Sequence, residues 1–326
     1  MGEWAERIAG ARSRTAIVPG ESARSGSRIE RVVLADGSTI IAKYLVWDED
    51  LMLRATGDDG RLDRLWRAGV FERMPSVIEH GLLGVEAAGS DWLVVMADVG
   101  ATLIADDRPV TRDENRRILA AGAALHAAFD GAVLPRIGTP DTLYRFLSPA
   151  MAVAEGDSPN PLPRLVGRGW DLFGEAVPRD VADAVAAIHA DPAAFAARYA
   201  SCRATLVHGD FRLANMGLRR DRLVLIDWGS SCVTGPGALD VAWYLIVGAT
   251  RIEATRDEIL DDFRAAEGER FEDRALGLAL VGALATLGWN KALDVVENVD
   301  PVARARERAD LDWWVARVRR ELEALG

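Results

Sequence analysis

The sequence predicts an α+β fold of two lobes, a small N-terminal lobe built on an antiparallel sheet and a larger, mostly helical C-terminal lobe. Two observations support this prediction. Segments with alternating or β-branched residues are concentrated before residue 98, and segments with apolar residues at helical spacing dominate after it. We therefore predict an N-terminal lobe over residues 1–97, a hinge over 98–102 and a C-terminal lobe over 103–326.

The N-terminal lobe is predicted to contain a β-hairpin first. The segments RIERVVL and STIIAKYLV are separated by an Asp-Gly turn, which is typical of tight hairpins. SVIEHGLLGVE and SDWLVVMADVG predict two more strands, with a Gly-Ser turn between them. Between the two pairs, GRLDRLWRAGVFERM has apolar residues at helical spacing and is followed by Pro75, so one inserted helix is expected.

The C-terminal lobe is predicted from three helical segments and one short pair of strands. TRDENRRILAAGAALHAAF begins with a threonine cap and has acidic residues in its first turn. DVADAVAAIHA and ALGLALVGALATLGWNKALDVV are the other helices, and NMGL and LVLID are short strands around a polar turn. The longest apolar run, Ala275 to Trp289, is too short and too rich in glycine to span a bilayer, so no membrane association is expected.

Composition limits the classes of partner. The formal net charge of −11 makes a nucleic-acid partner unexpected, because proteins that bind nucleic acid usually present a basic surface. The same charge suits both solubility and cationic ligands. Two cysteines, and a first segment without an apolar run, lead us to expect a cytoplasmic protein.

The stretch LVHGDFRLANMGLRRDRLVLIDWG gathers polar groups around short apolar runs. Asp210 lies in HGD, Asn215 follows five residues later, and Asp227 comes twelve residues after that, at the end of an apolar run. A buried polar group without a partner costs roughly 1–3 kcal/mol, so an ordinary core would avoid these groups. We therefore expect them to hold a ligand.

These motifs resemble those of the aminoglycoside phosphotransferase family and its choline-kinase relatives, which are protein-kinase-like small-molecule kinases. HGDFRLAN is similar to the family's H-G-D-x-x-x-x-N, IDWG is similar to I-D-[FWY]-[GE], and Lys43 in IIAKYL corresponds to the lysine of the β-rich lobe. The resemblance spans nearly the whole chain. It implies a bilobal protein-kinase-like fold and an ATP-dependent O-phosphotransferase that acts on a hydroxyl group.

The resemblance also implies a role for each polar residue. Asp210 would accept a hydrogen bond from the acceptor hydroxyl and orient it toward the γ-phosphate. Asn215 and Asp227 would be the oxygen ligands of Mg²⁺, and Lys43 would hold the α- and β-phosphates of ATP. Arg212, two residues after Asp210, is either a contact to the γ-phosphate or a surface arginine.

Two further segments are expected to bind the nucleotide. PGESARSGSRIE would cover the phosphates, with Ser22 in this loop and Gly26 allowing close approach of the backbone. MADVG would be the hinge that offers backbone groups to an adenine, through Met96, Ala97 and Val99.

The inserted helix departs from the family pattern. The family has an acidic residue near the start of this helix that pairs with the strand lysine, but here Leu62 occupies the expected position and Asp63 follows it. One residue corresponds to about 100° around a helix. We expect Asp63, or Glu72 farther along, to pair with Lys43 instead.

The segment after Asp227 argues against a protein substrate. Only twelve residues separate Asp227 from Asp240, which leaves no room for a long activation loop. In the resembled family the aspartate at the position of Asp240 supports the catalytic loop, which is the segment that carries HGD. His208 is expected to pack and to hydrogen-bond the backbone of the same loop.

The acceptor is therefore expected to be a small hydroxylated molecule, and its charge is open. The segment from Glu253 to Asp273 holds nine acidic residues and three arginines, and it is either a site for a cationic acceptor or a solvated helix face. Trp289 either packs in the core or forms an aromatic wall. An aminoglycoside or amino sugar is the leading expectation. The alternative acceptors are a sugar, or choline or another amino alcohol. The alternative function of the protein itself is that of a non-catalytic regulator that binds nucleotide.

Overall fold

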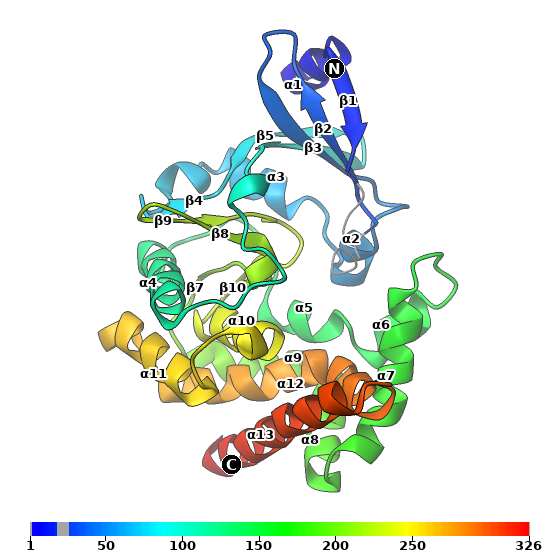
Figure 1. Cartoon of the computed structure of the whole chain (residues 1–326), viewed down its shortest axis with the longest axis vertical. Coiled ribbons are helices and arrows are strands. Elements are labelled where there is room, and N and C mark those ends of the chain that lie inside the picture. Colours follow the sequence, from blue (N-terminus) through cyan, green and yellow to red (C-terminus); the bar gives the residue numbers. More distant parts are fainter. Residues whose placement is uncertain (1, 18–25, 326) are drawn as a thin grey trace.

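The computed structural model describes residues 2–17 and 26–325, and it has the two lobes that the sequence predicts (Figure 1). The N-terminal lobe is built on a five-stranded antiparallel sheet with the strand order β1-β2-β3-β6-β5. Its strands are β1 Ser13–Ala16, β2 Arg28–Val33, β3 Thr39–Leu45, β5 Leu82–Ala88 and β6 Asp91–Ala97. The predicted hairpin is confirmed, since β2 and β3 pair around Gly37, which has a φ of 87°.

The first two elements, α1 (Glu3–Ala9) and β1, were not predicted. Both are short, so neither shows a clear period in the sequence. Tertiary contacts hold α1 in place, because the Glu86 carboxylate on β5 accepts hydrogen bonds from the Trp4 and Ala5 amides at 2.7 and 3.1 Å. A carboxylate at a helix N-terminus also interacts favourably with the helix dipole.

The segment SVIEHGLLGVE forms two strands rather than the single strand that we predicted. Gly81, with a φ of 69°, turns the chain between β4 (Ile78–Glu79) and β5. β4 leaves the N-terminal sheet and pairs in parallel with β9 (Arg222–Leu225), which pairs in turn with β8 (Met216–Arg219). This small sheet joins the lobes, and its strand β8 begins directly after Asn215.

The predicted inserted helix is also shorter than expected. The chain forms α2 (Leu51–Thr56), α3 (Arg61–Arg67) and a single turn, η1 (Phe71–Arg73). Asp50 caps α2 by accepting hydrogen bonds from the amides of Met52 and Leu53. α3 ends before Gly69, whose φ is 64°, and not at Pro75. The break divides the helical region into two short pieces.

The C-terminal lobe is mostly helical, and its three predicted helices are confirmed. They are α4, α8 and α12, and α4 begins with a capping box formed by Thr111 and Glu114. The helices of the lobe are α4 Arg112–Ala128, α5 Pro140–Arg145, α6 Pro149–Ala154, α7 Leu162–Ala176, α8 Arg179–Ala190, α9 Pro192–Ala197, α10 Ala238–Gly248, α11 Arg256–Glu267, α12 Asp273–Val296 and α13 Pro301–Leu325. Its remaining elements are η2 Gly100–Thr102, η3 Arg198–Ser201, β7 Thr205–Val207, η4 Leu213–Asn215, β10 Val233–Gly235, η5 Ala249–Arg251 and η6 Gly268–Arg270.

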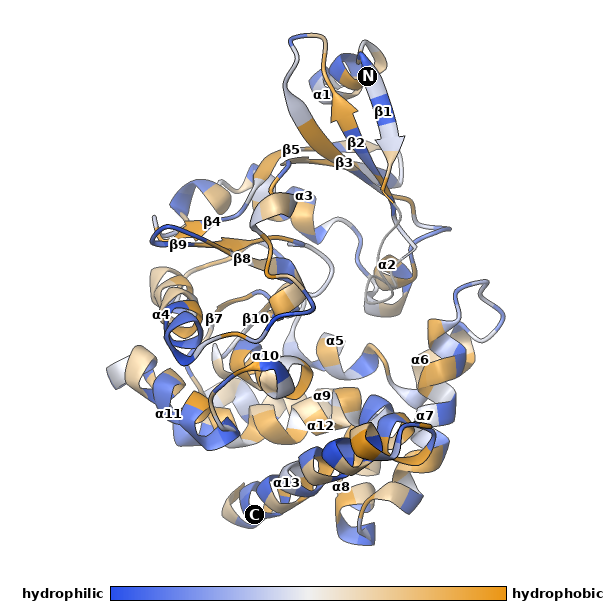
Figure 2. Ribbon diagram, viewed as in Figure 1, coloured by the Kyte–Doolittle hydropathy of each residue, from blue (hydrophilic) through white to orange (hydrophobic). Residues whose placement is uncertain are grey.

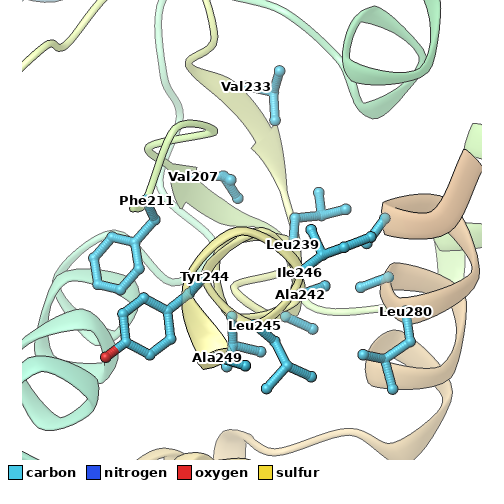
Figure 3. Packing of buried hydrophobic residues seen from close by; sticks show 14 of the residues in the cluster. Val207, Phe211, Val233, Leu239, Ala242, Tyr244, Leu245, Ile246, Ala249 and Leu280 are labelled. Carbon is cyan, nitrogen blue, oxygen red and sulfur yellow. The ribbon is translucent and has the colours of Figure 1, made fainter. Parts of the chain in front are cut away.

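The core of this lobe lies around α10 and α12. Figure 3 shows α10 end-on, with Tyr244 directed toward Phe211 of the catalytic loop, while Leu280 of α12 lies on the opposite side of α10. α12 is long and apolar enough to cross a membrane, but 83% of its most apolar window is buried inside the protein, as in the core helix of a globular domain. Its ribbon is largely orange to white in Figure 2. The core helix thus fixes α10, which in turn supports the catalytic loop.

Candidate active site

The catalytic loop turns sharply at Gly209. This residue has a φ of 76°, and a Cβ atom there would lie 1.9 Å from the carbonyl oxygen of Ser231, so only glycine fits. The buried Asp240 carboxylate at the start of α10 accepts hydrogen bonds from the amides of His208 and Gly209, at 3.0 and 2.8 Å. This contact confirms the expected support of the loop by Asp240.

His208 packs as the sequence analysis expected. Its side chain is fully buried and lies edge-on to Trp228 at 4.6 Å between ring centroids. Nδ1 accepts a hydrogen bond from the Asp210 amide, and Nε2 lies 3.0 Å from the carbonyl oxygen of Ile226. Because that carbonyl can only accept, this arrangement requires the neutral tautomer with a proton on Nε2. His208 therefore ties the HGD turn to the strand that leads to Asp227.

A second histidine lies behind the loop. His126 on α4 is buried between Asp240 and Glu267, with Nε2 3.1 Å from Asp240 and Nδ1 2.7 Å from Glu267. Burial alone would lower the pKa of His126, but its hydrogen bonds and charge interactions with the two carboxylates outweigh burial and raise it to about 9. The imidazolium thus neutralises two buried carboxylates, and Arg270 adds a further ion pair to Glu267.

Asp210 has three side-chain donors around its carboxylate. Asn215 donates from Nδ2 to Oδ2 at 2.8 Å and to the Asp210 carbonyl at 2.9 Å. Trp243 on α10 donates from Nε1 to Oδ1 at 2.9 Å. Arg212 donates from Nε to Oδ2 of Asp210 at 3.2 Å, so it belongs to the site and is not an isolated surface arginine. The carboxylate is fixed in orientation from three sides.

Lys43 and Asp227 form an ion pair across the lobes, with 2.5 Å between Nζ and Oδ1. Burial lowers the pKa of Lys43, but the charge and hydrogen bond of Asp227 outweigh it, so the pKa is raised overall. The pKa of Asp227 is correspondingly lowered, because the attraction of Lys43 outweighs the opposite effect of burial. Asp227 also has a φ of 64°, a strained conformation that is found most often at functional sites.

The predicted pairing of Asp63 with Lys43 is wrong, and so is the alternative with Glu72, since Lys43 pairs with Asp227. Asp63 instead forms an ion pair with Arg67 on its own helix at 2.9 Å. The physical reason is the register of α3. Leu62 is buried in the core, and Asp63, the next residue, lies where it reaches Arg67 one turn farther along the same helix.

Asp50 supplies the second acidic neighbour of Lys43, and it was not among the predicted site residues. Its carboxylate is buried, accepts a hydrogen bond from Ser27, caps α2 and contributes to the raised pKa of Lys43. Burial raises the pKa of Asp50 itself. An aspartate before the apolar start LML was the available indication, but α2 is too short to stand out as a helix.

These groups line one cleft of about 710 Å³ between the lobes. Lys43, Asp210, Arg212, Asn215 and Asp227 line it together. The predicted hinge residues Met96, Ala97 and Val99 lie along its edge. The volume of this cleft lies within the usual range for ligand pockets.

Two predicted residues of the nucleotide loop have other outcomes. Ser22 lies outside the described residues. Gly26 has a φ of 88°, and a Cβ atom there would lie 2.7 Å from the carbonyl oxygen of Glu49, so glycine is required next to the segment that carries Asp50. Gly26 is not among the residues that line the cleft.

The donor set near Asp227 fits a magnesium ion shared with phosphates. Nδ2 of Asn215 is committed to Asp210, which leaves Oδ1 as the atom of this amide that can face a cation. An amide oxygen and a carboxylate oxygen are the hard ligands that Mg²⁺ uses when phosphates complete its shell. Within residues 2–17 and 26–325, no cluster of three His, Cys, Asp or Glu residues could hold a metal by itself.

Comparison with known proteins decides the family. A family model described as the phosphotransferase enzyme family matches residues 49–280. The chain belongs to this family. The match covers most of the chain, including Asp50 and the whole catalytic loop, and it confirms the resemblance drawn from HGDFRLAN and IDWG. The protein is a phosphotransferase that acts on a hydroxyl group.

Solved structures share the fold of this phosphotransferase. Choline kinase from Streptococcus pneumoniae is 12% identical with a TM-score of 0.55, over 99% of this chain and 96% of that chain. A thermostable mutant of aminoglycoside phosphotransferase APH(4)-Ia is 15% identical with a TM-score of 0.52, over 96% of this chain and 97% of that chain. A search of curated proteins found no match. These similarities confirm the bilobal kinase-like fold.

Proposed function

We propose that this protein transfers the γ-phosphate of ATP to a hydroxyl group of a small molecule. The observation that carries the proposal is the convergence of Asp210, Asn215, Asp227 and Lys43 in one cleft between the lobes. Phosphoryl transfer depends mainly on positioning and on neutralising charge, and this set supplies a hydrogen-bond acceptor, two oxygen ligands and a cation.

In the proposed reaction, Asp210 accepts the hydrogen bond of the acceptor hydroxyl and takes its proton. The hydroxyl oxygen forms a bond to the γ-phosphorus, the bond from that phosphorus to the β–γ bridging oxygen breaks, and ADP leaves. Trp243 and Asn215 hold the Asp210 carboxylate in line during this step. Lys43 holds the phosphates of ATP.

Magnesium would be held by Asn215 and Asp227 together with the phosphates, and it would supply positive charge to the transferring group. With nucleotide and metal bound, Lys43 would contact the phosphates, and Asp227 would give up part of its contact with Lys43 to hold the metal. Asp227 has the exposure that this exchange needs, because its side chain is 37% exposed.

The choice of ATP is supported by a structural relative. A ternary complex of aminoglycoside phosphotransferase APH(4)-Ia contains ADP and hygromycin B, and that chain is 14% identical to this one with a TM-score of 0.52, over 96% of this chain and 97% of that chain. The hinge residues Met96, Ala97 and Val99 would bind the adenine.

A small acceptor rather than a protein is supported by the short segment between Asp227 and Asp240. The free cysteines Cys202 and Cys232 fit the cytoplasmic location that we propose.

The proposal is tested by incubating the protein with MgATP and a panel of hydroxylated amines, sugars and amino alcohols, with mass detection of phosphorylated products. The Asp210→Asn variant is the matched control. A product that depends on Asp210 is expected. Tight MgATP binding without any phosphorylated product would instead favour the regulator that binds nucleotide without catalysis.

A further inference from the structure

We propose that the acceptor is a hydroxylated molecule with an apolar face and at most one positive charge, and that it binds against Trp243 and Trp289. This inference rests on the proposed function, because it concerns the acceptor half of the same cleft. We use this term for the part of the cleft beside Asp210 and Arg212 whose other lining residues come from Phe146–Leu162 and Trp243–Glu307.

The walls of the acceptor half are apolar. Phe146 and Leu147 precede α6, Trp243 and Val247 come from α10, and Leu287 and Trp289 come from α12, and all of them line the cleft. α10 and α12 pack against each other (Figure 3), so their side chains form a continuous surface. An acceptor that removes this surface from water must present an apolar face of its own.

Trp243 links this wall to the reacting atoms. Its indole N–H donates to Asp210, while the residue lines the cleft. A hydroxyl group that reaches Asp210 must therefore lie beside an indole ring. Trp243 is a positioning residue for Asp210 and at the same time part of the surface that selects the acceptor.

Trp289 contributes a second indole ring to this wall. The residue is 3% exposed and lines the cleft, and its Nε1 atom is buried without a hydrogen-bond partner within residues 2–17 and 26–325. Because Nε1 is enclosed, the N–H group does not face a ligand in this arrangement, and Trp289 acts as an apolar part of the wall.

The charge of this half excludes a polycation. Besides Asp210 and Arg212, the ionisable residues that line it are Lys291, Asp294 and Glu307, with a formal sum of −1. Lys291 lies 2.6 Å from Asp310 and 3.9 Å from Glu307, so the protein already neutralises part of the acidic charge. A ligand with several ammonium groups would bring buried charges without partners, which is strongly unfavourable.

The acidic segment from Glu253 to Asp273 lies elsewhere. None of its residues lines this cleft. On α11, Glu258 pairs with Arg112, and Asp262 pairs with Arg116 at 3.1 Å. The segment that the sequence offered as a site for a cationic acceptor therefore contacts α4, and it adds no acidic residue to the acceptor half.

The inference is tested by binding, so that it does not depend on turnover. The full-length protein with MgADP is mixed with a pool of hydroxylated probes from two classes, and retained probes are identified by ultrafiltration and mass detection. Erythromycin and lincomycin represent apolar-faced molecules with a single amine, and kanamycin A and hygromycin B represent polar molecules with several amines. We expect retention of the first class to exceed that of the second by at least about tenfold, or about 1.4 kcal/mol.

Two variants sharpen the result. Val247→Glu places a carboxylate on the wall at a residue that is 40% exposed, and we expect it to shift retention toward the polyamines. Val302→Glu makes the same change on α13 at a residue that does not line the cleft, and it should leave retention unchanged.

Two results would overturn the inference: preferential retention of the polyamine class, or retention of neither class by the wild-type protein. Failure of the proposed function is a different observation. In that case probes of the first class are retained, but none of them gains a phosphate when MgATP replaces MgADP.

Discussion

Two charged clusters contact opposite sides of the catalytic loop, and they differ in which groups neutralise their charge and complete their hydrogen bonds. Behind the loop, Asp240 is fully buried and is bonded by His126 and by the amides of His208 and Gly209. In front of it, Asp227 has Lys43 as its ion-pair partner and remains partly exposed to the cleft.

The difference indicates which cluster supports the loop and which one is available to take part in the reaction. The cluster behind the loop is completed by protein groups alone, so it fixes the backbone that carries Asp210. The cluster in front is open to ligands, because the Asp227 side chain is partly exposed to the cleft. Changes in front should therefore alter binding and turnover, and changes behind should alter stability.

The largest effect is expected from Asp210→Asn. Asparagine keeps the shape but cannot take the proton of the acceptor hydroxyl, so kcat should fall by about 10²–10⁴. Nucleotide affinity should stay within about twofold, because Asp210 faces the acceptor. Steady-state kinetics and calorimetric titration with MgATP measure the two quantities.

Asp106→Asn is a matched control on an exposed carboxylate, where both quantities should be unchanged. If Asp210→Asn retained more than about a tenth of wild-type kcat, Asp210 would not have the role assigned to it.

The second effect distinguishes the two residues that we propose as metal ligands, Asn215 and Asp227. Asp227→Ala removes a full charge and also the partner of Lys43, whereas Asn215→Ala removes only a dipole and one bond to Asp210. We expect MgATP affinity to fall about 10–100-fold in Asp227→Ala and less in Asn215→Ala. Titrations with MgATP and with ATP plus EDTA decide, and equal, unchanged affinities in both variants would remove Asp227 from the site.

The motif residues were predictable from sequence, but their supports were not. HGD, Asn215 and Asp227 lie within one stretch whose spacing the chemistry restricts, so a local pattern identifies them. Asp50 and Trp243 reach the site from elements far along the chain, and only tertiary packing brings them to Lys43 and Asp210.

The same limit explains the errors in the fold. α1, α2 and the two-residue strand β4 are too short to show a period, and Gly81 and Gly69 interrupt segments that looked continuous. The predicted pairing of Asp63 with Lys43 failed for a related reason. One step along α3 separates Leu62, which is buried in the core, from Asp63, which pairs with Arg67. The long, periodic helices α4, α8 and α12 were predicted correctly because packing repeats along them.

The third prediction concerns pH and the cluster behind the loop. The pKa of His126 is raised to about 9 in the folded protein, above the ordinary value of 6.5. The stabilisation is therefore complete below about pH 6.5 and is lost as the pH rises through about 9. The free energy of unfolding should fall by up to about 3 kcal/mol across this window, since each pKa unit corresponds to about 1.36 kcal/mol. Urea unfolding at three pH values measures it.

His126→Gln is the control, because glutamine can donate a hydrogen bond but does not titrate. Its stability should be lower at pH 6.5 and should not decline across the window. Burial lowers the pKa of His80 and His189, so their effects lie at lower pH. Burial also lowers the pKa of Lys291 and raises that of Cys202 and Cys232, and these groups titrate alike in both proteins, so the difference between the two profiles isolates His126. A wild-type profile parallel to that of His126→Gln would show that His126 is neutral.

A smaller effect is expected from Asp50→Asn. Asparagine caps a helix as well as aspartate does, so α2 should be retained while the negative charge near Lys43 is lost. KM for ATP should rise about two- to fivefold, the scale of a charge interaction of about 0.5–1 kcal/mol. Kinetics with ATP as the varied substrate measures this, and an unchanged KM would remove Asp50 as the group that orients Lys43.

The smallest effect is expected from Asp63→Ala, which is the matched comparison for Asp50→Asn. Asp63 pairs with the exposed Arg67 and lies in the first turn of α3, so its loss should lower stability by about 0.3–1 kcal/mol. Because Lys43 pairs with Asp227 instead, kcat and KM for ATP should stay within about twofold of wild type. Thermal unfolding and the same ATP kinetics separate the two effects. If Asp63→Ala raised KM as much as Asp50→Asn does, Asp63 would contact Lys43 in the nucleotide-bound state, and the division between the two acids would fail.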